Sequence, residues 1–180
     1  LNLWNVENVC DMAGMFCFCE NFNQPLESWK PIKVECMTKM FMGAESFNSA
    51  LNTWKLGRVT CMDYMFYKCY SFNQPIDDWE LSKVSNMEGM FHSCINFNQP
   101  LEKWQVSSVS NMKNMFRFCS QFNQPLNSWD TMNVEDMTGM FQDCKEFDQP
   151  LGSWYIYELE YKEAIFKGCD KLWKSLYKFK

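Results

Sequence analysis

The sequence predicts an α/β repeat solenoid, a stack of about seven coils of 25 residues, each with a short parallel strand and a short α- or 3₁₀-helix. The first observation behind this prediction is a fixed period: the pattern recurs every 25 residues without insertion or deletion. Coils of this size bury their apolar side by stacking on their neighbours. The second is that one tryptophan marks each repeat, at Trp4, Trp29, Trp54, Trp79, Trp104, Trp129 and Trp154.

The third observation is the apolar spacing inside each coil, which suggests where strand and helix lie. In the coil that begins at Leu101, alternation near Trp104 and Val106 favours a strand at 101–106. Apolar residues then recur every three or four positions from Val109 to Cys119, which suits one or two helical turns. The Phe-Asn-Gln-Pro segment is expected to turn the chain back, because proline fixes φ and ends a helix.

Equivalent residues of successive coils are expected to form columns. The aromatic columns should build the core, at Trp29, Trp54, Trp79, Trp104, Trp129, Phe91, Phe97, Phe116 and Phe122. The recurring Asn and Gln of the Phe-Asn-Gln-Pro turn have two readings, a ladder that satisfies backbone groups of a buried turn or a ligand site. The ladder is the interpretation we favour.

The regular array is expected to cover residues 1–154, and residues 155–180 to form a degenerate last repeat and a C-terminal cap. Lys162 interrupts the Met column there, and Ile165 and Phe166 replace the usual core. Terminal repeats differ because one of their faces meets water. A basic amphipathic helix on a membrane surface is the alternative for the Lys-rich end. Because Leu1 is already in register with Leu26, the chain is interpreted as a fragment of a longer array or a processed product.

One long motif connects the chain with a known family. The fourth and fifth coils carry it as Met87, Met90-Phe91, Cys94, Phe97-Asn98-Gln99-Pro100-Leu101, Trp104, Val106-Ser107, Val109 and Asn111-Met112. This pattern resembles the repeat of BspA-like leucine-rich-repeat surface proteins, in their 25-residue form of unknown function. The resemblance implies a leucine-rich-repeat-like stack, a cell-surface or secreted location, and a role in adhesion or partner binding. It offers no catalytic residues.

Composition argues against two classes of partner. The chain of 180 residues has 17 basic and 22 acidic residues, for a net charge of −5. Nucleic-acid binding needs a basic footprint, which is not visible here. No apolar run approaches the length needed to span a bilayer, so we expect no transmembrane segment.

The cysteines are numerous, but their spacing does not indicate a metal site. No Cys-x-x-Cys pair occurs among the ten, and the lone His92, expected to face water, cannot complete a zinc set. We expect buried, reduced thiols, which favour a reducing intracellular compartment and conflict with a surface location. We expect no metal and no cofactor. The main column contains Cys19, Cys69, Cys94, Cys119, Cys144 and Cys169.

We expect no catalysis either, because the sequence lacks a Gly-rich phosphate loop and a recognisable nucleophile–base set. Function is expected on an outward face, at positions beside each Trp that differ from coil to coil. We call this set the Trp-flanking face: Lys30, Lys55, Asp78, Glu80, Lys103, Gln105 and Asp130.

The hypothesis for this face is a non-enzymatic module for protein–protein interaction or adhesion, which binds a protein partner and is itself a monomer. An intracellular viral or protist scaffold with reduced cysteines is the alternative function. The alternative for the face itself is that its residues are unconstrained solvent positions.

Overall fold

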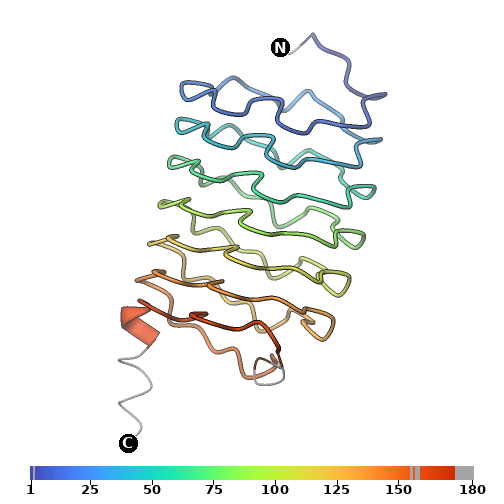
Figure 1. The fold of residues 1–180 in the computed structure, drawn as a ribbon. Coiled ribbons are helices and arrows are strands. Elements are labelled where there is room, and N and C mark those ends of the chain that lie inside the picture. Colours follow the sequence, from blue (N-terminus) through green and yellow to red (C-terminus); the bar gives the residue numbers. More distant parts are fainter. Residues whose placement is uncertain (2, 155, 157–158, 173–180) are drawn as a thin grey trace, which may run out of the picture.

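Stacked coils make up the computed structural model, which describes residues 1, 3–154, 156 and 159–172. Each repeat of 25 residues makes one turn of the chain, and the turns lie one on the next from the N-terminal to the C-terminal end (Figure 1). Parallel bridges join equivalent residues of consecutive coils: Asp11↔Cys36, Cys36↔Cys61, Cys61↔Asn86, Asn86↔Asn111, Asn111↔Asp136 and Asp136↔Tyr161.

The predicted α/β solenoid is wrong in its secondary structure. Within the described residues, α-helix occurs only at 170–172, and the parallel pairing consists of isolated bridges rather than of strands in a sheet. Each coil is instead a succession of turns and short extended links. The repeat period was therefore read correctly, but the local structure assigned to it was not.

The expected strand at 101–106 fails because a turn occupies its first half. The N–H of Trp104 donates to the carbonyl of Leu101 at 3.2 Å, and the N–H of Val109 donates to that of Val106 at 2.9 Å. Hydrogen bonds between residues three apart close β-turns. Only the short link between these turns is extended, which is too short to form a ladder.

The expected helix at 109–119 fails because two of its residues have left-handed backbone. Asn114 has φ 54° and Phe118 has φ 60°, and the same two positions have positive φ in every coil. A right-handed helix cannot pass through such residues. Turns close on either side of them, with Met115 N–H donating to Met112 C=O at 3.2 Å and Cys119 N–H to Phe116 C=O at 2.9 Å.

Hydrogen bonds between coils replace the missing helical ones. Alternate N–H groups of the fifth coil donate to carbonyls of the sixth: Met112 to Asp136, Asn114 to Thr138 and Phe116 to Met140, each at 2.9 Å. Phe118 continues the series to Gln142 at 2.8 Å. Backbone polar groups in the buried half of each coil thus find partners in the neighbouring coil, as burial requires.

Aromatic side chains stack in columns along the core. The Trp104 ring lies between those of Trp79 and Trp129, with centroids at 6.3 and 6.2 Å, and its Nε1–H donates to the carbonyl of Ile76 at 2.9 Å. Phe91 packs beside it at 6.1 Å. All nine aromatic residues expected in the core are at most 2% exposed: Trp29, Trp54, Trp79, Trp104, Trp129, Phe91, Phe97, Phe116 and Phe122.

The Asn and Gln columns form a ladder, which favours the structural reading of these residues. Asn73 Oδ1 accepts from the backbone N–H of Asn98 at 2.9 Å and from Gln99 Nε2 at 3.0 Å. The same pair of bonds links Asn98 to Asn123 and Gln124 in the next coil. Each Asn therefore satisfies the turn above it.

The main cysteine column also has a structural role. Cys119 Sγ donates to the carbonyl of Phe91 in the preceding coil at 2.8 Å, and Cys69, Cys94 and Cys144 make the equivalent bond. Burial raises the pKa of each of these four thiols. All four are buried and unpaired, as predicted. Cys19, in the first coil, is exposed.

The structure describes part of the expected cap. Phe166 continues the aromatic column, 5.9 Å from Phe141, whereas the Lys-rich segment 173–180 lies outside the described residues. The described residues include no helix of sufficient length and apolarity to cross a membrane.

Candidate functional site

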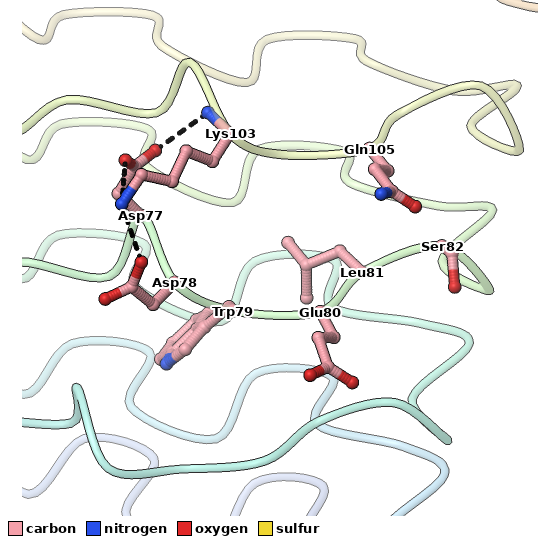
Figure 2. Close-up of a pocket in the computed structure, with 8 residues that line it drawn as sticks. All are labelled: Asp77, Asp78, Trp79, Glu80, Leu81, Ser82, Lys103 and Gln105. Carbon is pink, nitrogen blue, oxygen red and sulfur yellow. Dashed lines mark hydrogen bonds and ion pairs between the residues drawn. The ribbon is translucent and has the colours of Figure 1, made fainter.

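A groove of about 460 Å³ lies on the outer side of the fourth and fifth coils, at the Trp-flanking face. Its lining combines acidic, basic and amide side chains around the indole of Trp79 (Figure 2). We call it the acidic groove; its lining residues are Asp77, Asp78, Trp79, Glu80, Leu81, Ser82, Lys103 and Gln105.

The buried Trp column positions the polar residues of this groove. Trp79 and Leu81 are buried, while Asp78, Glu80 and Ser82 are exposed. The chain is extended between its two turns here, and successive side chains of an extended segment point to opposite sides. Anchoring Trp79 and Leu81 in the core therefore turns Asp78, Glu80 and Ser82 outward.

Lys103 connects the two coils across the groove. Its Nζ lies 2.8 Å from Asp78 Oδ1 and 3.5 Å from Asp77 Oδ2. The backbone N–H of Lys103 also donates to Asp77 Oδ1, at 2.9 Å. Asp77 thus holds both the main chain and the side chain of Lys103 (Figure 2).

The ion pair keeps both of its partners charged. The hydrogen bond from Lys103 lowers the pKa of Asp78, and Lys55 in the preceding coil lowers it further. The same bond to Asp78 raises the pKa of Lys103. Both side chains are exposed, so the pair contributes little to stability. Its consequence is a fixed pattern of charge at neutral pH.

Glu80 and Gln105 extend the groove in different directions. Glu80 points away from Lys103 and toward the third coil (Figure 2). A Cβ built on Gly57 would lie 3.4 Å from Glu80 Oε2, which places the carboxylate beside that glycine. Glu80 and Asp78 thus give this part of the face a negative charge that Lys103 only partly balances.

The structure exposes all seven residues of the Trp-flanking face but gathers only four of them in one groove. Asp78, Glu80, Lys103 and Gln105 line it. Lys30 borders a separate hollow of about 190 Å³ near the N-terminal end and pairs with Glu7 at 3.7 Å. Lys55 and Asp130 are exposed outside the groove, and Asp130 Oδ1 accepts from the N–H of Met132 at 3.2 Å.

Asp77 is the residue of the groove that the sequence-based set missed. It is more buried than Asp78, with 16% of its side chain exposed against 71%. A signal existed, because Asn127 holds the equivalent position two coils later and its Oδ1 accepts from the N–H of Ser153 at 3.3 Å. The column therefore tends to carry an acceptor for the next coil.

A larger, mostly apolar hollow of about 1040 Å³ lies at the last coil, among Trp154, Ile165 and Phe166. Residues 155, 157 and 158, next to Trp154 in the sequence, are not among the described residues. The acidic groove lies wholly within described coils. We therefore treat the groove as the candidate site. Within the described residues, no group of three or more His, Cys, Asp or Glu side chains is placed to hold a metal ion.

His92 lies outside the groove and does not face water as expected. It is half-buried, with its ring 4.8 Å from that of Tyr67 and its Nδ1 2.9 Å from Ser93 Oγ. Burial and the nearby Arg117 guanidinium lower its pKa to about 4. Neutral His92 is therefore the form that the fold accommodates.

We expect His92 to make stability depend on pH between about 4 and 6.5. The unfolded chain binds a proton near the ordinary pKa of His, and the folded chain binds it only near pH 4, so acid favours unfolding across this window. Because the ring is half exposed, the loss should be roughly 1–2 kcal/mol. Denaturant titrations of the native chain and of His92→Gln at pH 7 and 4.5 measure it. Equal losses in both proteins would contradict the assignment.

Comparison with known proteins identifies one family. A family model described as "Mycoplasma protein of unknown function, DUF285" matches residues 1–94 and, in a second overlapping match, residues 62–179. Searches of curated proteins and of solved structures gave no match.

Proposed function

We propose that the chain, which belongs to the DUF285 family of Mycoplasma proteins of unknown function, is a non-enzymatic module for protein–protein interaction or adhesion. The proposed binding surface is the Trp-flanking face, with the acidic groove at its centre. The observation that carries the proposal is a contrast between neighbouring columns of residues.

That contrast separates structural positions from free ones. The Trp column is the same in every coil and is buried from Trp29 to Trp154. The residue directly after each Trp is exposed and changes from Lys30 and Lys55 to Glu80, Gln105 and Asp130. A stack whose coils each meet a different part of one partner needs such individuality, whereas packing does not produce it.

The charge order along the face suits an extended protein segment. Two lysines come first, the carboxylates of Asp78 and Glu80 follow, and Asp130 lies toward the C-terminal end. A partner with acidic residues opposite the lysines and basic residues opposite the carboxylates would bind in one register. Alternating signs do not suit nucleic acid, which requires a continuous basic stripe.

The electrostatics of the groove support binding rather than catalysis. A general acid or base works best with a pKa near the operating pH. In the groove the shifts run the other way, because the pKa of Asp78 is lowered and that of Lys103 is raised. Both groups remain charged near neutral pH and are suited to holding a charged partner.

The location of this activity follows from two lines of argument. Resemblance to BspA-like leucine-rich-repeat surface proteins favours adhesion at a cell surface. The buried, unpaired cysteines favour the second candidate, an intracellular scaffold with reduced thiols. Alkylation of the protein purified from its source under non-reducing conditions separates them, since a surface protein should show oxidised cysteines.

The binding proposal is tested by exchanging the charges of one ion pair. Asp78→Lys combined with Lys103→Asp keeps net charge and the pair itself but reverses its direction, so folding should be unchanged while partner binding weakens about tenfold, which is about 1.4 kcal/mol. The immobilised chain is incubated with source extract, and captured proteins are quantified by mass spectrometry.

The matched control is Glu45→Lys combined with Lys145→Glu. Both residues are exposed, occupy equivalent positions away from the Trp column, and have no ion pair in the structure. The control should capture the same proteins as the native chain. Equal capture by the groove variant and the native chain would contradict the proposal.

A further inference from the structure

Two cysteines outside the buried column lie together on the second and third coils. We propose that Cys36 and Cys61 form a modification site, a dithiol that low-molecular-weight disulfides convert into an intramolecular disulfide linking these coils. Nothing in the proposed binding function requires this site, and the two proposals stand on different residues.

The geometry places the two sulfur atoms in contact. Cys36 and Cys61 are joined by a parallel bridge, and their Sγ atoms are 3.0 Å apart. Backbones of neighbouring parallel segments lie about 4.8 Å apart, within the range of Cα separations that a disulfide can span. Closing the bond requires the sulfurs to approach by about 1 Å, which side-chain rotation can supply.

The comparison with other coils shows that these cysteines depart from the usual role of their column. Asp11, Asn86, Asn111 and Asp136 hold the equivalent positions. The side-chain oxygen of each accepts from the N–H two residues on, at 2.7–3.0 Å. Sulfur is a poor acceptor for such a bond. Two adjacent coils thus lack the local bond and carry a thiol pair.

Nearby polar groups orient the pair. Cys61 Sγ donates to Cys36 Sγ, Cys36 Sγ to Thr38 Oγ1 at 3.3 Å, and Thr38 Oγ1 to Asp63 Oδ1 at 2.7 Å. Both thiols are partly exposed, unlike the buried column of Cys94 and its equivalents. Burial and the bond to Cys36 raise the pKa of Cys61, so reaction requires mildly alkaline conditions.

The reaction is two successive thiol–disulfide exchanges. One protein thiolate attacks a sulfur of the small disulfide RSSR, forming a mixed disulfide and releasing RS⁻. The other protein thiolate then attacks the protein sulfur of that mixed disulfide, forming the Cys36–Cys61 bond and releasing a second RS⁻. The two thiol protons end on the released thiolates, so one dithiol and one RSSR give one protein disulfide and two RSH. Contact between the reacting sulfurs favours the second step over release of the mixed disulfide.

The test uses oxidised glutathione as RSSR at mildly alkaline pH, on the native chain and on a chain whose three first-coil cysteines, Cys10, Cys17 and Cys19, are replaced by Ser. The latter should lose the mass of two hydrogens without gaining glutathione. Digestion should yield one peptide pair linking Cys36 and Cys61. The oxidised chain should unfold at a higher denaturant midpoint, returning to its starting value after reduction.

Single variants fix the interpretation. In the same background, Cys36→Ser should retain one glutathione on Cys61, because the second exchange has no thiol to use. Retention of glutathione on Cys61 when Cys36 is present would overturn the proposal. It would be overturned equally if neither cysteine reacts while the first-coil cysteines of the native chain do, or if the linked peptides contain other cysteines.

Discussion

Trp104→Ala is expected to lower the free energy of unfolding by about 3–5 kcal/mol, the largest effect we predict for a core substitution. The indole is 2% exposed, stacks between Trp79 and Trp129, and donates to the carbonyl of Ile76. Removing it leaves a cavity shared by three coils and a buried acceptor without its donor. Denaturant titration followed by circular dichroism measures the loss.

The control for this substitution is the neighbouring Lys103→Ala. Lys103 is exposed and its ion pairs with Asp77 and Asp78 are at the surface, so its removal should change stability by no more than about 0.5 kcal/mol. Similar losses for both substitutions would mean that the stacked indoles do not carry the stability of the coils.

Gly89→Ala is expected to destabilise the chain by roughly 2–4 kcal/mol, although the change adds one methyl group. Gly89 has φ +55°, and a Cβ at this position would lie 2.5 Å from the ring of Tyr64 in the preceding coil. That ring is held by the Tyr64 hydroxyl, which donates to Glu88. Both the backbone conformation and the close approach therefore oppose the added methyl group.

Two further proteins separate those causes. In a Tyr64→Gly background the space opens, and Gly89→Ala should cost only the backbone part, about 1–2 kcal/mol. Gly152→Ala should be within about 0.5 kcal/mol of neutral, since no atom lies within 4 Å and φ is not positive. An unchanged cost in the Tyr64→Gly background would show that the ring is not the obstacle.

The repeat period and the inward-facing residues could be predicted from sequence, but the backbone path could not. Residues that close a turn lie three apart and both face inward, so Met112, Met115, Phe116 and Cys119 show a spacing that also fits a helix. The contrary signal was the recurrence of glycine at Gly89 and Gly139, inside the expected helix. Glycine recurring at one coil position indicates positive φ, and the structure shows it there.

The outward face was predictable to the same extent. A buried Trp column implies exposed neighbours, and Asp78, Glu80, Lys103 and Gln105 lie together as neighbours of that column. The role of Asp77 could not be predicted, because its bonds to Lys103 depend on how two coils meet side by side rather than on either coil alone.

The central claim, that the Trp-flanking face binds the partner, is tested most directly by a lysine-labelling footprint. A protein retained by the native chain is bound, the complex is acetylated briefly, and modification at each lysine is compared with that of the free chain by mass spectrometry. The account predicts protection of Lys30, Lys55 and Lys103, with Lys83 and Lys145 labelled as in the free chain. Protection of Lys145 with unchanged labelling of Lys55 and Lys103 would contradict it.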